Sequence, residues 1–199
     1  MEQTTEQKIL EAAKKVFLER GLDSARMQEI ADEAGINKAL LHYYFRSKEK
    51  LFDHILQGVI AGHFPKVVKI MESDAPIFNK IQEFCEIYIS QMQQTPYVPF
   101  FIISEINRDA AGFLKKVLGD KRPPVLNFIT QLQVEIAAGI IRPINPVHLL
   151  MNILSLCLFP FLSRPMLQHV TGMELQQFNA LMEERKKIVP QLIIDSIKA

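Results

Sequence analysis

Residues 30–52 read IADEAGINKALLHYYFRSKEKLF, and this stretch decides how the front of the chain folds. Its apolar spacing is that of two short helices joined by a tight turn, the helix-turn-helix arrangement. Helices that cross steeply over such a turn need a small residue where their backbones approach, and Ala31 supplies one. Gly35 can adopt the positive φ angle that the turn requires, because it has no Cβ. Ile36 and Leu41 are expected to fill the wedge between the two helices.

The same stretch concentrates positive charge on a chain that is almost neutral as a whole. The net charge is +1 over 199 residues, so the protein is not a general polycation. Residues 35–50 nevertheless carry four basic side chains against one acidic side chain, namely Lys38, Arg46, Lys48 and Lys50 against Glu49. A local patch of this kind can attract the phosphates of a nucleic acid.

The helix that follows Gly35 presents side chains that suit the major groove of DNA. A recognition helix needs donors for base edges, small apolar groups for thymine methyls, and cations or phenols for phosphates. The residues left on its outer face are Asn37, Lys38, Ala39, Leu40, His42, Tyr43 and Arg46. We therefore predict that this helix contacts DNA. Phe45 is expected in the core, whereas core packing and exposure stay equally open for Tyr44.

Helical periodicity continues on both sides of this stretch. Thr4 and Gln7 have the spacing of a capping box, and Gly21 is placed to end the first helix. The following helices are expected at about Ser24–Ala34 and Lys38–Phe45, with Ser47 capping a fourth, long helix. Prolines then divide the rest into helical lengths, namely Pro65, Pro76, Pro96, Pro99, Pro123, Pro124, Pro143, Pro146 and Pro165, with a kink at Pro190 in the last helix.

The pattern as a whole predicts an all-α protein of about nine or ten helices. Residues 1–47 are expected to form a three-helix, helix-turn-helix DNA-binding domain, and residues 48–199 a larger helical domain. Cys85 and Cys157 lie in apolar segments and are expected to be reduced core thiols. The longest apolar stretch, residues 146–162, is short and interrupted by polar residues and Pro160. This stretch is expected to be a buried helix. The protein is expected to be cytoplasmic and to have no membrane partner.

Residue patterns for catalysis and metal binding are missing from the sequence. His54, His63, His148 and His169 have no cysteine or carboxylate partner at metal-ligand spacing. There is also no nucleophile elbow, P-loop or paired-carboxylate motif. We therefore expect neither an enzyme nor a bound metal or cofactor.

These residues resemble the TetR family of bacterial transcriptional regulators, over a region from about Ile9 to Leu56. The strings that carry the resemblance are A-A-x-x-x-F-x-x-x-G, I-A-x-x-A-G-I-x-K-x-x-L-x-Y-Y-F and S-K-E-K-L-F. The resemblance implies a sequence-specific regulator with an all-helical ligand-binding and dimerisation domain. By family default it is a repressor, released from a palindromic operator by a small, mostly apolar ligand. The alternative that stays open is a ligand-independent DNA-binding or nucleoid-associated protein that recruits a protein partner.

The resemblance also assigns roles to individual positions. It implies DNA contacts for Arg26 and Gln28 of the second helix, for Lys38, His42 and Tyr43 of the third, and for Lys48 at the start of the fourth. A helix N-terminus such as the one at Lys48 favours an anion through its dipole. The chain departs from the family near Ala25 and Arg26 and at Leu40, where threonines are usual, and at His42, where tyrosine is common. Charge on Arg26 and a methyl contact at Leu40 are the expected replacements.

Dimerisation and ligand binding are expected in the larger domain. Dimers of this class place their recognition helices about 34–36 Å apart, and the chain must supply a self-complementary apolar surface. The candidates for this surface are Leu149, Leu156, Leu175, Phe178, Met182, Val189 and Leu192, with intramolecular packing as the alternative for each. The resemblance implies that the last two long helices form it. The candidates for a ligand pocket are Phe84, Tyr88, Met92, Phe101, Glu105, Phe128 and Asn152, with ordinary core packing as the alternative.

Overall fold

The computed structural model describes residues 3–199, and the regular elements in this range are ten helices. They are α1 (Thr5–Ser24), α2 (Met27–Glu33), α3 (Lys38–Tyr44), α4 (Lys48–Glu72), α5 (Ile77–Gln94), α6 (Val98–Leu118), α7 (Val125–Ala137), α8 (Pro146–Leu162), α9 (Arg164–Thr171) and α10 (Leu175–Ile197). The all-α prediction is therefore confirmed, together with its number of helices.

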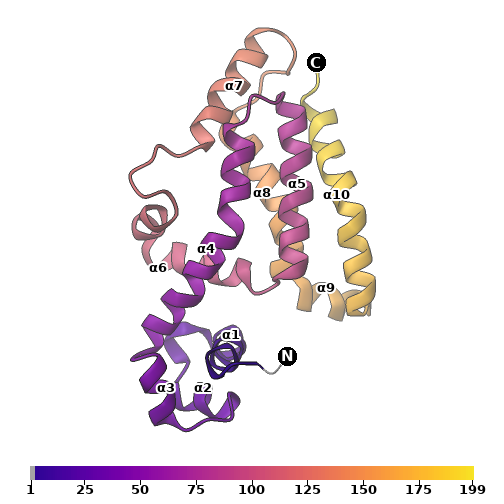
Figure 1. Cartoon of the computed structure of the whole chain (residues 1–199). Coiled ribbons are helices and arrows are strands. Elements are labelled where there is room, and N and C mark those ends of the chain that lie inside the picture. Colours follow the sequence, from indigo (N-terminus) through magenta and orange to yellow (C-terminus); the bar gives the residue numbers. More distant parts are fainter. Residues whose placement is uncertain (1–2) are drawn as a thin grey trace.

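The helices form a small lobe and a large lobe that are joined by α4 (Figure 1). The small lobe contains α1, α2 and α3 at the N-terminal end of the chain. In the large lobe α5, α8 and α10 lie side by side, and α7 lies at the end far from the small lobe. α4 begins in the small lobe and continues along the large one, so a single rod connects the two.

Capping residues mark the starts of α1 and α4 as predicted, whereas α1 continues past Gly21, its predicted end, to Ser24. The Gln7 N–H donates to Thr4 Oγ1 at 3.2 Å and the Thr4 N–H to Gln7 Oε1 at 2.9 Å, which completes the capping box. Gly21 has a φ of +74° and turns the chain within α1. α2 begins at Met27, later than predicted, because Arg26 has an extended backbone. Ser47 Oγ caps α4 by accepting a bond of 3.3 Å from the Lys50 N–H.

The prediction that Pro65 separates two helices is wrong. α4 continues through Pro65 to Glu72, and α8 and α10 continue through Pro160 and Pro190. A proline inside a helix leaves the carbonyl four residues earlier without its N–H donor. For Pro65 that residue is Ala61, and both residues are exposed, so water can take the place of the lost donor.

Each lobe has its own hydrophobic core. The core of the small lobe combines α1, α2 and α3 with the first turns of α4, and it also takes in Phe101 and Phe113 from α6. Phe52 of α4 stacks on Phe101 with ring centroids 4.9 Å apart, and Phe17 meets Phe101 edge-on at 6.1 Å. Phe17, Phe52 and Phe101 are almost completely buried. The junction of the lobes is therefore a packed contact between α1, α4 and α6.

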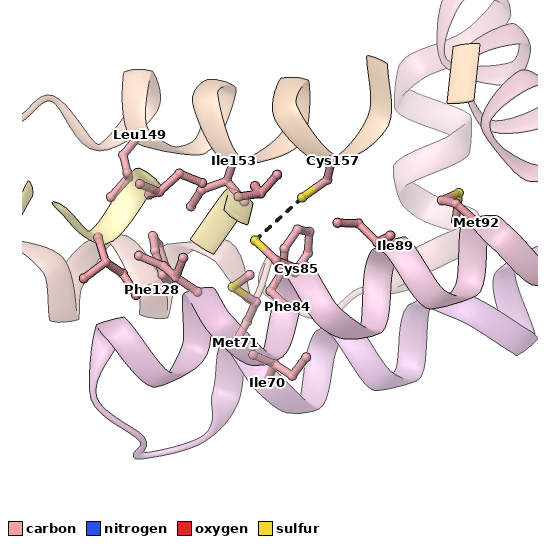
Figure 2. Packing of buried hydrophobic residues seen from close by; sticks show 14 of the residues in the cluster. Ile70, Met71, Phe84, Cys85, Ile89, Met92, Phe128, Leu149, Ile153 and Cys157 are labelled. Atoms are coloured by element: carbon pink, nitrogen blue, oxygen red, sulfur yellow. Dashed lines mark hydrogen bonds between the residues drawn. The ribbon is translucent and has the colours of Figure 1, made fainter. Parts of the chain in front are cut away.

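The core of the large lobe buries both cysteines between α5 and α8 (Figure 2). Cys85 and Cys157 are free thiols, as predicted, and their sulfur atoms lie 3.6 Å apart. The hydrogen bond from Cys157 Sγ to Cys85 Sγ, together with burial, raises the pKa of Cys157 far above the usual range of a thiol. Since the thiolate is the reactive form, we expect Cys157 to react slowly with thiol reagents.

None of the helices that the structure describes is by itself long and apolar enough to span a membrane. Among the described helices, α8 and α9 would be long and apolar enough only when taken together, and they are bent by 65° at the break between them.

His63 connects α4 to the end of α5 and makes the stability of the fold depend on pH. Its Nδ1 lies 3.0 Å from the Val59 carbonyl oxygen and its Nε2 lies 2.7 Å from Thr95 Oγ1. Burial lowers the pKa of His63 below its ordinary value of 6.5; the hydrogen bond to Val59 opposes this and the charge of Lys66 adds to it. The unfolded chain therefore binds a proton at a higher pH than the folded chain does.

We expect the urea midpoint of unfolding to fall as pH decreases from 7 to 5, and to fall less in a His63→Gln variant. The decrease begins as pH passes below the ordinary histidine pKa and ends at the lowered pKa of the folded state. His169 is exposed, so His169→Gln is the control and should follow the wild type. If His63→Gln were as sensitive to pH as the wild type, His63 would not be the responsible group.

Candidate nucleic-acid interface

α2, the turn at Gly35 and α3 form the predicted helix-turn-helix. Gly35 has a φ of +67°, a conformation that residues with a Cβ rarely adopt. The Ile36 N–H donates to the Ala31 carbonyl at 3.0 Å and closes the turn. Ile30, Ala31 and Leu41 are completely buried, so the inner face of each helix is fixed in the core. The outer face of α3 is consequently held in one orientation by rigid packing.

Asn37 begins α3 and has a structural role in addition to its predicted one. Its Oδ1 accepts a bond of 2.8 Å from the Leu40 N–H, which makes it the N-cap of the helix. Because the oxygen is used in this way, the amide NH₂ is the group that Asn37 can offer to a base. Ala39 beside it is exposed and Leu40 is half-buried, so both can present methyl groups.

The remaining predicted residues of α3 form an exposed surface of cations and rings. Lys38, His42 and Arg46 are exposed, and Tyr43 is 82% exposed. The ring of Tyr43 packs edge-on against Tyr44 at a centroid distance of 5.6 Å, so Tyr44 belongs to the surface and supports Tyr43. The two adjacent exposed rings and the cations beside them make this face of α3 a candidate binding surface.

Two further predicted side chains lie at the beginning of α2. Arg26 and Gln28 are both exposed. The Arg26 backbone N–H donates to Glu29 Oε2 at 2.9 Å, which leaves the guanidinium out of the cap. Gln28 Nε2 donates to Asp32 Oδ1 at 2.8 Å, so its carbonyl oxygen remains available as an acceptor.

Lys48 has contacts that sequence reasoning did not foresee. Its ammonium lies within 3.3 Å of three carbonyl oxygens, those of Leu22, Asp23 and Ala25. These carbonyls end α1 without helical donors, and an ammonium has three N–H groups, one for each. Lys48 therefore connects the end of α1 to the start of α4, and a phosphate contact would require it to release one carbonyl. In the sequence, the only feature that could have predicted these contacts is the end of the first helix, where carbonyl oxygens lack helical donors.

Comparison with protein families agrees with this geometry in both lobes. Residues 9–55 match the family described as "Bacterial regulatory proteins, tetR family". Residues 78–193, more than half of the chain, match "Tetracyclin repressor-like, C-terminal domain". The chain belongs to the TetR family. As a TetR-family protein it is a DNA-binding, helix-turn-helix transcriptional regulator and not an enzyme, and membership implies an operator DNA partner and typically a dimer.

Individual relatives support the same assignment. The chain is 26% identical to the HTH-type transcriptional regulator RutR of Escherichia coli K12 over 184 residues, covering 91% of this chain and 86% of RutR. It is 36% identical to the HTH-type transcriptional repressor KstR2 of Mycobacterium tuberculosis H37Rv over 74 residues, or 37% of each chain. The solved structure of the ketosteroid transcriptional regulator KstR2 of Mycobacterium tuberculosis covers 100% of this chain and 97% of its own, with a TM-score of 0.75 and 20% identity, and so shows the fold.

The large lobe of this TetR-family chain contains an apolar cavity of about 230 Å³ beside α4. Two of the predicted pocket residues, Phe84 and Phe128, line it. The other five are not among its lining residues. Sequence reasoning missed most of the lining, for example Phe64, Val68 and Val117, because nothing local distinguishes these residues from ordinary core positions.

The five other candidates have different surroundings. Tyr88 stacks on Phe84 at 5.2 Å, Met92 lies in the core of the large lobe, and Phe101 lies in the core of the small lobe. Asn152 is exposed. Glu105 is 1% exposed and accepts bonds from Arg108 Nε and Lys116 Nζ, both at 2.8 Å, so its charge is already compensated.

The candidates for the dimer surface divide between the inside and the outside of the large lobe. Leu149, Phe178, Met182 and Val189 are each at most 3% exposed and belong to the core, whereas Leu156 is half-buried. Leu175 and Leu192 are more than half exposed. The other exposed apolar residues of α8 and α10, which were not among the candidates, are Val147, Met151, Leu154, Phe159, Leu162, Leu181 and Ile188.

Proposed function

We propose that the protein is a repressor that binds a palindromic operator as a homodimer and is released by a small, mostly apolar ligand. The exposed surface of α3, with Tyr43, Lys38 and Arg46 on a helix anchored by Leu41, is the observation that carries this proposal. Residues 1–47 would contact the DNA and residues 48–199 would bind the ligand and the second subunit. A regulator of transcription acts where the DNA is, and the cytoplasm is therefore its proposed location.

Operator contact is proposed for the exposed residues of the helix-turn-helix. α3 would enter the major groove, with Lys38 and the Asn37 amide towards base edges, and with Ala39 and Leu40 towards thymine methyls. His42, Tyr43 and Arg46 would contact the sugar-phosphate backbone of the DNA, as would Arg26 and Gln28 from the start of α2. Lys48 has the weakest claim of the predicted residues, because it must first release one of its three carbonyl contacts.

The dimer interface is proposed on the outer faces of α8 and α10. Leu181, Ile188 and Leu192 are spaced at intervals of seven and four residues, so they form one stripe along α10. Met151, Phe159 and Leu162 supply exposed apolar groups on α8. Many large apolar side chains are therefore exposed on these two helices, and a second copy related by a twofold axis would cover them. Leu175 and Leu192 are retained from the predicted set, whereas Leu149, Phe178, Met182 and Val189 serve the intramolecular core.

Ligand release is proposed to act through α4. The apolar cavity is lined by Phe64, Val67, Val68 and Met71 of α4, and the same helix carries Leu51 and Phe52 into the small-lobe core. A ligand that fits the cavity in only one orientation of α4 would shift the equilibrium towards that orientation. The two recognition helices of a dimer would then no longer match one turn of DNA.

Footprinting on the DNA upstream of the protein's own gene tests this function. We expect a protected palindrome of one or two helical turns, bound far more tightly than random DNA at the same salt concentration. Equal affinity for random and upstream DNA, governed by salt alone, would instead indicate a nonspecific DNA-binding protein.

A further inference from the structure

Lys80 of α5 is a buried cation that forms no salt bridge within the described residues. Its side chain is 2% exposed, and its ammonium donates to the Met71 carbonyl oxygen at 3.1 Å. Within residues 3–199 no carboxylate oxygen lies within 4.0 Å of it, and it has no second hydrogen-bond partner. An ammonium has three donors, so two of them lack a protein acceptor. Burial lowers the pKa of Lys80, and the charges of Asp74 and Glu135 only partly oppose this.

Lys80 lies where two cavities of different polarity meet. The apolar cavity of about 230 Å³ is lined on one side by Met71, Phe84 and Phe128. A second cavity of about 430 Å³ is polar and is lined by Arg122, Asn127, Thr130 and Gln131, among others. Met71 and Lys80 are the two residues that line both cavities. A molecule lying across this junction would have an apolar end and a polar end, with the ammonium between them.

We propose that this junction binds an amphipathic organic monoanion, with its apolar body in the inner cavity and its anionic group on the Lys80 ammonium. The site is the effector site of the proposed function, and the inference rests on that function only for its effect on DNA. A volume of about 230 Å³ holds roughly eight groups of the size of a water molecule, at about 30 Å³ each. Carboxylates with about eight carbon atoms therefore have a suitable length.

The charges around the polar cavity favour a single negative charge over several. Glu72, Asp74 and Arg122 also line this cavity, and all three are exposed, so water and salt screen them. The formal charges of these three groups and of Lys80 sum to zero. A monoanion can pair with the buried ammonium, whereas additional negative charges would meet the two carboxylates at the rim.

The alternative to anion binding is a purely structural role for Lys80. Met71 lies in the last turn of α4, where carbonyls lack helical donors, and a cation there is favourable by itself. A purely structural lysine would affect stability. It would not make the protein distinguish an anionic ligand from a neutral one of the same length.

Calorimetric titration with octanoate and with n-octanol tests the proposal on the wild-type dimer, a Lys80→Met variant and a Lys80→Arg variant. We expect the wild type to bind octanoate at least about tenfold more tightly than n-octanol, since charge-assisted hydrogen bonds are the strong ones. Lys80→Met should lose this preference while still binding n-octanol, and Lys80→Arg should retain it. Lys69→Met removes an exposed lysine of α4 and should behave as wild type.

Several results would overturn the inference. These are equal binding of the two ligands by the wild type, binding of neither, and a preference that survives in Lys80→Met. The wild-type comparison alone can overturn it, so the test does not depend on the variants folding. Operator affinity measured in the same solutions separates this inference from the proposed function. Lys80-dependent binding of octanoate without release of the operator would support the ligand class and contradict the effector role. Release of the operator by n-octanol, with equal affinity for n-octanol and octanoate, would support the effector role and contradict the ligand class.

Discussion

Replacing Lys38 and Tyr43 together with alanine is expected to weaken operator binding by about 1,000-fold. A lost base or phosphate contact costs at least about 1 kcal/mol, and a symmetric dimer loses each contact twice, which gives about 4 kcal/mol for the double substitution. Both side chains are exposed, so the free energy of unfolding should change by about 0.5 kcal/mol or less. Fluorescence anisotropy with the footprinted operator, at fixed salt, measures the effect.

Two controls show whether the loss belongs to α3. Lys15 is an exposed lysine of α1 that pairs with Glu33 at 2.7 Å, and Lys15→Ala should leave operator affinity within about twofold of wild type. The dependence of affinity on salt should also become shallower in Lys38→Ala if this lysine contacts phosphate. Operator binding by the double variant at wild-type strength would mean that another part of the chain reads the DNA.

Replacing Ile188 with glutamate is expected to convert the proposed dimer into a monomer. Ile188 is 54% exposed in the middle of the α10 stripe, and a glutamate there would place two negative charges against each other across a twofold axis. Light scattering after size exclusion should change from twice 22.8 kDa to 22.8 kDa. Operator affinity should fall by at least about 100-fold, since a monomer engages only one half-site at a time.

The matched control for this substitution is Val134→Glu. Val134 is 63% exposed on α7, so the change is of the same kind at a different place. This variant should remain a dimer and keep its operator affinity. A monomeric Val134→Glu, or a dimeric Ile188→Glu, would contradict the assignment of the interface to α8 and α10.

The helix-turn-helix could be predicted from the sequence because its geometry depends on residues close together in the chain. Ala31, Gly35 and Leu41 each satisfy a steric condition set by neighbours within a few turns, and the structure has them buried or at positive φ as expected. The exposure of the outer face of α3 follows from the same periodicity. Lys48 is the exception, since its partners lie 23 to 26 residues away along the chain.

The large lobe was harder to predict because α8 and α10 are apolar on more than one face. Phe178 and Met182 point into the core, whereas Leu181 and Ile188 of the same helix are exposed. A hydrophobic pattern alone does not say which face meets the chain and which meets a second copy. The prediction at Pro65 was wrong for another reason, because the carbonyl that loses its donor is exposed to water and α4 can therefore continue. The cavity depends on how several helices diverge, and this leaves no local signal.

The continuity of α4 would allow a small displacement at the cavity to rotate this helix in the proposed mechanism. Taking the Phe52–Phe101 contact as a pivot, the arm to Val68 is sixteen residues, or about 24 Å at about 1.5 Å per residue. A displacement of about 2 Å at the cavity would then turn the arm by about 5°. The coupling between the two sites is reciprocal. An operator that holds the small lobes in place would resist the ligand, and the protein bound to DNA would have its ligand affinity reduced by the factor by which the ligand reduces its affinity for DNA.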